Sequence, residues 1–111
     1  MKSDEIKIKK YLLKLGFQPN LKGYHLLARI IEIAAEGGHI LPLKYAGYRM
    51  LSDEFKVDSG SVEKDIQNAI SSAWLRGDVE TLYGEFGETL DENKGKPTNK
   101  QFILTAIERL Y

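Results

Sequence analysis

Hydrophobic residues recur every three or four positions along most of the chain, and strict two-residue alternation is scarce. The first spacing is typical of amphipathic helices and the second of strands, so the pattern predicts an all-α fold. A first helix should begin near Ser3, a residue type that caps helices, and should end at Gly16. A second helix should carry the apolar stripe of residues 26–34 and end at Gly37.

The centre of the chain predicts two shorter segments. Pro42 suits the first turn of a third helix, because its missing N–H has no helical partner there. That helix should break near Gly47, since glycine costs about 1 kcal/mol inside a helix. A short helix from about Tyr48 to Phe55 then leads into a tight turn.

Residues 48–76 have the spacing of a helix-turn-helix. Such a motif needs a buried residue before the turn, a small one where the helices meet, an apolar anchor in the turn and another in the second helix, and these are Leu51, Ser52, Val57 and Val62. Lys56 replaces the usual turn glycine, and Asp58 can cap a long second helix that ends at Gly77. Spacing alone leaves DNA binding and a plain helical pair equally open, because short-turn helix pairs are common in bundles.

The outward face of this second helix is polar. Its residues are Ser59, Gly60, Ser61, Glu63, Lys64, Gln67 and Asn68. Amide side chains can pair with adenine, a carboxylate can accept from the cytosine amino group, and an ammonium can donate to guanine. A solvated face explains the same residues, and a glutamate near a helix N-terminus stabilises the helix dipole without any partner.

The last third of the chain predicts a short helix over residues 79–83, a loop over 85–96 and a final helix over about 98–110. Thr98 and Gln101 have the spacing of a capping box at the start of that helix. Trp74 is expected in the core with Tyr48, Phe55 and Phe102, and it should pack with Leu51, Val57 and Val62 where the two central helices cross.

The composition excludes several classes of function. The 111 residues fit one domain, residues 1–111, and no apolar run is long enough to span a membrane. Without cysteine, disulfides, thiol catalysis and cysteine zinc sites are excluded. No residue spacing indicates a catalytic site, a metal site or a cofactor, so we do not expect an enzyme. The lysine-rich start has no apolar region after it, which indicates a cytoplasmic protein rather than an exported one.

Charge is unevenly spread although the net charge is zero. Residues 1–29 and 94–111 are basic, and the stretch between them is acidic. Phosphate contacts should therefore depend on the ends and on scattered cations of the turn region. The expected phosphate-contacting residues are Lys56, Ser59, Lys94, Lys96, Thr98 and Lys100, with Lys64 as a further cation on the second helix.

Three stretches together resemble a known family: "NLKGYHLLARII", "FKVDSGSVEKDIQNAISSAWLRGDVETLYGEFG" and "KPTNKQFI". The chain from about Leu12 to Leu110 is similar to the C-terminal effector domain of the sporulation-initiation response regulator of bacteria. The most specific feature is the pairing of A-W-x-R-G at residues 73–77 with K-P-T-N at residues 96–99.

This resemblance implies a compact bundle of about six helices and a sequence-specific transcription regulator whose long second helix enters the DNA major groove. It implies base contacts at Ser61, Glu63 and Lys64, where the family carries arginine in place of Ser61 and of Lys64. It also implies double-stranded DNA as partner, bound in tandem or as a homodimer, and contact with the RNA polymerase sigma factor. The polymerase contacts would fall on Tyr83, Phe86 and Leu90.

Loss of the family arginine at Ser61 removes one expected guanine reader. The alternative is therefore an interaction module that kept the fold and now binds protein. A basic surface around Lys64 and Lys96 would favour DNA, and an acidic one would favour the alternative.

Overall fold

The computed structural model describes residues 2–87 and 95–111, and these form helices connected by turns and loops, without a strand. In chain order the helices are α1 (Lys2–Lys14), α2 (Lys22–Ala35), α3 (Gly47–Phe55), α4 (Ser59–Arg76), α5 (Val79–Phe86) and α6 (Asn99–Leu110). The predicted all-α fold of about six helices is confirmed.

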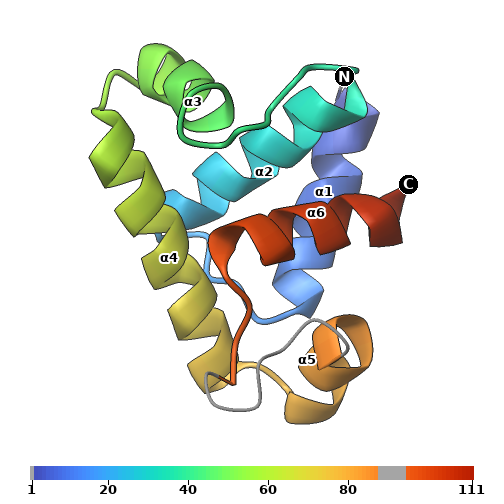
Figure 1. Cartoon of the computed structure of the whole chain (residues 1–111). Coiled ribbons are helices and arrows are strands. Elements are labelled where there is room, and N and C mark those ends of the chain that lie inside the picture. The colour runs from blue at the N-terminus through green and yellow to red at the C-terminus, as the bar shows by residue number, and fades with distance from the viewer. Residues whose placement is uncertain (1, 88–94) are drawn as a thin grey trace.

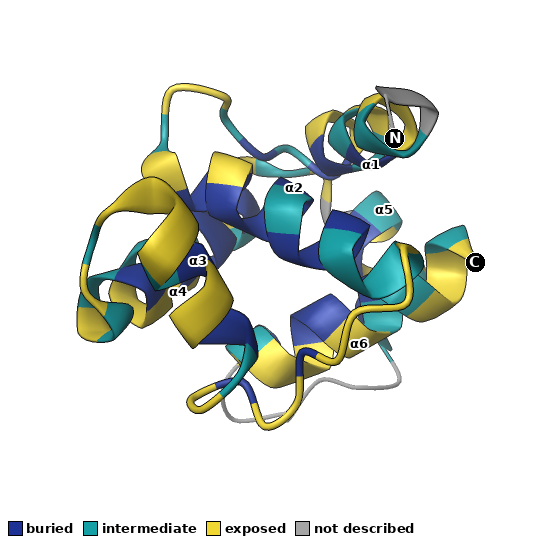
Figure 2. Ribbon diagram, turned by 90° about the horizontal axis from the view of Figure 1, so that it is seen from above, coloured by how far each residue is buried: buried dark blue, intermediate teal, exposed yellow. Residues whose placement is uncertain are grey.

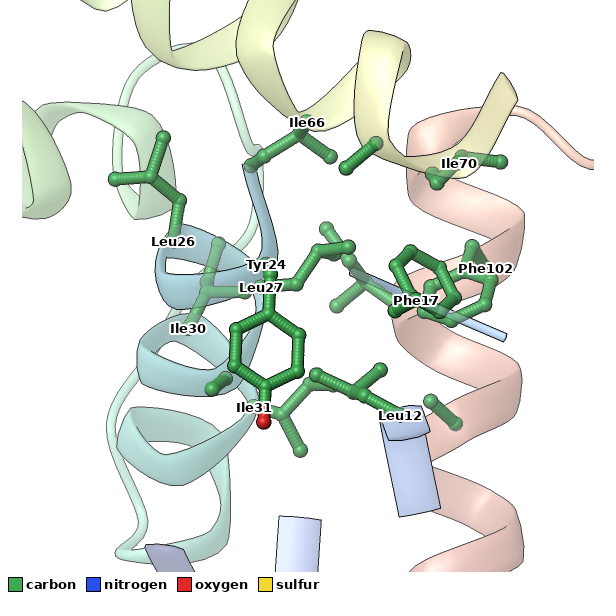
Figure 3. Packing of buried hydrophobic residues seen from close by; sticks show 14 of the residues in the cluster. Leu12, Phe17, Tyr24, Leu26, Leu27, Ile30, Ile31, Ile66, Ile70 and Phe102 are labelled. Carbon is green, nitrogen blue, oxygen red and sulfur yellow. The ribbon is translucent and has the colours of Figure 1, made fainter. Parts of the chain in front are cut away.

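Helix α2 is the centre of the bundle, and α1, α3, α4 and α6 pack around it (Figure 1). Its apolar stripe is wide enough to face several neighbours at once, and Leu26, Leu27, Ile30 and Ile31 are almost completely buried. Figure 3 shows these side chains in the space between Ile66 of α4 and Leu12 of α1. Seen from above, the buried surfaces face the interior and the exposed ones lie along the outer sides of α3 and α4 (Figure 2). Because α2 is buried by so many partners, it fixes where α4 lies.

Helices α2 and α4 cross at very close range at Gly23. A Cβ atom at this position would lie 2.1 Å from the Asp65 carbonyl oxygen and 2.6 Å from the Ala69 Cβ. Backbone atoms cannot move aside without shifting the whole helix, so only glycine fits at this crossing. The side of α4 opposite this contact is consequently turned to solvent.

One predicted helix cap and one predicted helix start are wrong. Helix α1 already includes Ser3, because it begins at Lys2, so Ser3 is not its cap. Residues 42–46 form turns instead of a helix that starts at Pro42, since the Tyr45 and Ala46 amides both donate to the Pro42 carbonyl oxygen (3.1 and 2.8 Å). The Gly47 amide then donates to the Ile40 carbonyl oxygen (2.9 Å), and α3 begins there.

Aromatic rings fill the space between α4, α5 and α6. Phe86 and Phe102 are buried and stacked, with ring centroids 4.8 Å apart. Trp74 meets Phe86 edge-on at 5.3 Å, and Phe17 lies 5.1 Å from Phe102. Edge-on and offset arrangements of this kind are the preferred aromatic geometries. The cluster therefore attaches α5 and α6 to the C-terminal half of α4.

The prediction that Trp74 packs where α3 and α4 cross is wrong. Leu51 and Val62 are fully buried and Val57 is partly buried, as expected at the crossing of α3 and α4. Trp74, however, lies about 18 Å further along α4 than Val62, given a rise of 1.5 Å per residue. It is half-buried against Phe86 and Phe102 instead. Phe55, also expected in the core, is 37% exposed because it is the last residue of α3.

Candidate nucleic-acid interface

The turn between α3 and α4 depends on the backbone of Lys56 and on hydrogen bonds of Ser52. Lys56 has a left-handed backbone (φ 60°), which is the conformation that a glycine at this position would adopt easily. The Val57 amide donates to the Ser52 carbonyl oxygen at 3.2 Å, and the Ser52 hydroxyl donates back to the Val57 carbonyl oxygen. Ser52 is thus more than a small residue, because it ties the two sides of the turn together.

Asp58 caps α4 as predicted. Its Oδ1 accepts from the amides of Gly60 (2.8 Å) and Ser61 (3.2 Å), and its Oδ2 accepts from the Ser61 hydroxyl (2.8 Å). The Ser61 hydroxyl and amide, followed by the Gly60 amide, hold the pKa of the Asp58 carboxyl below its ordinary value. This carboxylate is therefore used locally, and the Ser61 hydroxyl points back to it.

A second acidic residue of the motif is also used inside the protein. Glu54 at the end of α3 accepts two hydrogen bonds from the Arg29 Nε, at 2.9 and 3.0 Å. Arg29 lies on α2 and also donates to Glu32 at 2.8 Å. These pairs connect α3 to α2 and turn the Glu54 carboxylate toward α2, so part of the negative charge of the motif is neutralised within the fold.

The face of α4 that was expected to point outward does so over its first three turns. Glu63, Lys64, Gln67 and Asn68 are all exposed. On the opposite side Val62, Ile66 and Ala69 are buried against the bundle. Ser59 and Ser61 are half-buried at the N-terminal end.

The start of α6 is attached directly to this part of α4. The Asn99 side-chain amide donates to the Glu63 carbonyl oxygen and to the Tyr48 hydroxyl, both at 3.1 Å. Thr98 and Gln101 form the predicted capping box, with the Gln101 amide donating to the Thr98 hydroxyl at 3.1 Å and the Thr98 amide donating to the Gln101 side-chain oxygen at 2.9 Å. The Lys96 ammonium donates to the Ser71 hydroxyl on α4. The 96–99 segment therefore has a fixed position beside α4.

Between these elements lies a groove of about 700 Å³. It brings together Glu63 and Gln67 of α4 with Lys96, Thr98 and Lys100, which the sequence separates by about thirty residues. The complete lining consists of Leu41, Pro42, Leu43, Lys44, Tyr48, Glu63, Gln67, Ile70, Lys96, Pro97, Thr98, Asn99 and Lys100. Its charged residues are three lysines and one glutamate, so the groove beside α4 is basic.

The remaining phosphate candidates lie elsewhere. Lys56 is exposed in the turn and Ser59 begins α4, so both lie at the N-terminal end of α4 rather than in the groove. Lys94 is outside the described residues. Lys44, Tyr48 and Asn99 line the groove although sequence reasoning did not select them for it. No local signal marks them, because their positions depend on contacts between distant segments.

The lysines of α1, which are part of the basic N-terminal end of the chain, lie outside the groove beside α4. Helix α1 lies on the opposite side of α2 from α4 in both views (Figures 1 and 2). One of its lysines, Lys7, donates to the Leu110 carbonyl oxygen at 2.6 Å and lies over the Tyr111 ring at 4.3 Å. Its charge is used to attach α1 to the end of α6.

The residues expected to contact the polymerase differ in their exposure to solvent. Tyr83 is 66% exposed on α5. Phe86 is 1% exposed and stacked on Phe102, so it supports α5 from inside and has no surface to offer a partner. This corrects the expectation for Phe86. Leu90 is outside the described residues.

Within residues 2–87 and 95–111, no group of histidine and carboxylate side chains is arranged to hold a metal ion, and no helix has the length and apolarity to cross a membrane.

Comparison with protein families gives a match to the family described as "Sporulation initiation factor Spo0A C terminal". The match covers residues 8–110, from the middle of α1 to the last residue of α6.

Proposed function

The chain belongs to the family of Spo0A C-terminal domains, DNA-binding domains of transcription regulators in sporulation, and from this premise we propose that it binds double-stranded DNA sequence-specifically through α4. The observation that carries the proposal is the exposed polar face of α4 next to a basic groove. Glu63 and Gln67 belong to both, so a duplex read by α4 would have lysines beside it. This role belongs in the bacterial cytoplasm, where the chromosome is.

Base reading is proposed for the exposed residues of α4. Glu63 would accept a hydrogen bond from a cytosine amino group, Lys64 would donate to guanine, and Gln67 and Asn68 would pair with adenine edges. Ser61 is short, and its hydroxyl is bonded to Asp58, so it reads less than the family's arginine would. We therefore expect the preferred DNA box to differ from the family's at the base pair facing this position.

Backbone contact is proposed for the lysines and for the two helix starts. Lys56 and Ser59 lie at the N-terminal end of α4, where the helix dipole favours phosphate. Lys96, Thr98 and Lys100 surround the start of α6. The proposal extends to Lys94. These contacts would position the duplex without reading its sequence.

Partners other than DNA follow from the family membership as further proposals. The exposed Tyr83 on α5 is the best remaining candidate for contact with the polymerase sigma factor, because Phe86 is buried. Tandem or dimeric binding on DNA would place a second copy of the domain next to the first.

The test is a titration of labelled duplexes at two salt concentrations, about 50 and 200 mM. One duplex carries the family's DNA box and the other a scrambled sequence. We expect tighter binding to the box at both concentrations and a steep loss of affinity with salt for both duplexes, since lysine–phosphate contacts release counterions. Failure to bind any duplex near 50 mM salt would overturn DNA binding and favour the interaction-module alternative.

Two substitutions test the reading residues directly. Glu63→Ala should lose discrimination at one base pair, worth about 1–3 kcal/mol, while nonspecific binding stays equal or improves. Ser61→Arg should raise affinity for boxes that contain guanine at the facing position. Glu80→Ala on α5 is the matched control, because it also removes an exposed carboxylate but lies away from the groove. If Glu63→Ala tightens binding to all sequences alike, Glu63 lies on a solvated face and reads no base.

A further inference from the structure

Two distant parts of the chain line the basic groove. Lys96 lies just before α6 and Lys100 lies in its first turn, and the lining also includes the segment 41–44 between α2 and α3. This segment is held in place by its own turn, in which the Tyr48 amide donates to the Leu43 carbonyl oxygen at 2.7 Å. The Leu43 side chain is buried, so the backbone beside it is anchored to the core.

Lys44 stands on this anchored segment with an exposed side chain. No carboxylate within residues 2–87 and 95–111 lies within ion-pair distance of its ammonium, which lies 5.6 Å from the centre of the Tyr45 ring. Lys7 of α1 is different, because its ammonium donates to the Leu110 carbonyl oxygen and lies over the Tyr111 ring. The charge of Lys44 is therefore available to a ligand in the groove.

We infer that Lys44 binds a phosphate of the same DNA strand that Lys96 and Lys100 contact, an inference that rests on the proposed DNA binding. Three ammonium groups from two distant segments surround the groove, and the acidic group in its lining is Glu63 on the base-reading side. A strand running through the groove would thus meet cations from both segments. The sugar carbons of that strand would lie against the apolar lining residues Leu41, Pro42 and Pro97.

The shared residues of α4 favour a DNA strand over an acidic protein segment as the occupant. Glu63 and Gln67 line the groove and also belong to the exposed face that would enter the major groove. A duplex held against that face necessarily brings one of its two backbones alongside. The segment 41–44 would then extend the interface beyond the helix-turn-helix and the start of α6.

The first experiment measures the salt dependence of binding for Lys44→Ala with the same labelled duplexes. Loss of one phosphate contact should lower the slope of log affinity against log salt by about 0.9. Over a fourfold rise in salt, the variant should therefore lose about threefold less affinity than the parent protein. The loss of affinity should be equal for box and scrambled DNA. Lys10→Ala on α1 is the matched control and should leave the slope unchanged, since Lys10 is exposed and lies outside the groove.

A second experiment identifies the contact itself. Single phosphates of the box duplex are replaced one at a time by neutral methylphosphonates, and each duplex is titrated with the parent and with Lys44→Ala. One position should weaken the parent and leave the variant unaffected, because its partner is already gone. Equal losses for both proteins at every position, or a parental slope in Lys44→Ala, would overturn the inference while leaving the proposed function intact. A parent that binds no duplex overturns both.

Discussion

The two halves of α4 differ in what surrounds them. The first half, residues 59–68, buries Val62 and Ile66 on one side and leaves a polar face in solvent on the other. The second half, residues 69–76, carries Trp74 into the aromatic cluster with Phe86 and Phe102. The first half begins at a capped turn, and the second half anchors α5 and α6.

This difference explains why α4 is longer than a recognition helix requires. Its 18 residues span about 27 Å, and only part of that length can face one DNA groove. The aromatic cluster holds the C-terminal half. Val62, Ile66 and the crossing at Gly23 hold the N-terminal half from one side, so its polar face stays exposed in a fixed orientation. Substitutions on the polar face and in the aromatic cluster should therefore have separable effects.

The largest effect should come from the aromatic cluster that packs against the C-terminal half of α4. Phe102→Ala removes a fully buried ring that contacts Phe17, Trp74 and Phe86, and should lower the free energy of unfolding by about 3–5 kcal/mol. Trp74→Ala should lower it by less than about 3 kcal/mol, because part of the indole is already in solvent. Urea unfolding measures both variants. Equal losses would contradict the distinction between the two rings.

The crossing of α2 and α4 should show the next largest effect. Gly23→Ala places a Cβ atom 2.1 Å from the Asp65 carbonyl oxygen, and overpacking of this kind costs about 1–3 kcal/mol or more. DNA affinity should fall with stability, since both halves of α4 would shift. Gly84→Ala in α5 is the control, because its Cβ would meet no atom within 4 Å and alanine favours a helix by about 1 kcal/mol. Unfolding and DNA titration of the pair check the prediction.

The turn before the recognition half should separate stability from binding. Lys56 has a left-handed backbone, which costs a residue other than glycine about 1–2 kcal/mol. Lys56→Gly should therefore stabilise the protein, by less than about 1 kcal/mol after the greater freedom of the unfolded glycine is subtracted. It should also reduce the salt slope of DNA binding by roughly one. Lys56→Asn, which tolerates this backbone and also lacks the charge, should reproduce the lost slope.

The smallest effect should be the pH dependence of the α4 cap. The pKa of Asp58 in the folded protein lies below its ordinary value of 3.8. A lowered folded pKa means that the charged cap stabilises the protein fully above the unfolded pKa and loses this effect as pH falls through the folded pKa. Asp58→Asn keeps a capping oxygen without this titration. Thermal unfolding should show the advantage of the parent at pH 6 shrinking toward pH 2. A constant difference would mean that the charge of Asp58 contributes nothing.

Local chemistry was enough to predict most of the helices. The Asp58 cap and the Thr98–Gln101 capping box were readable because each depends on residues within one helical turn. The long helix from Ser59 to Arg76 and the short one ending at Phe55 followed from periodicity. The helix predicted to start at Pro42 is absent, because proline suits a turn as well as it suits the first turn of a helix.

The candidate interface was only partly predictable. Exposure of Glu63, Lys64, Gln67 and Asn68 followed from the spacing of buried residues on the other side of α4. The bond between Ser61 and Asp58 was not foreseen, although both residues lie within one turn, because it depends on a side-chain rotamer.

By itself, the sequence determined the helices, the position of the turn and the polar face of α4, since these depend on neighbours within about four residues. The tertiary structure alone decided which distant segments share a surface. It brought Lys44 and Lys96 to one groove, placed α1 away from that surface and placed Trp74 in the aromatic cluster. The physical reason is that such contacts arise where helices cross, and the crossing at Gly23 depends on the combined shape of all the surfaces packed around α2.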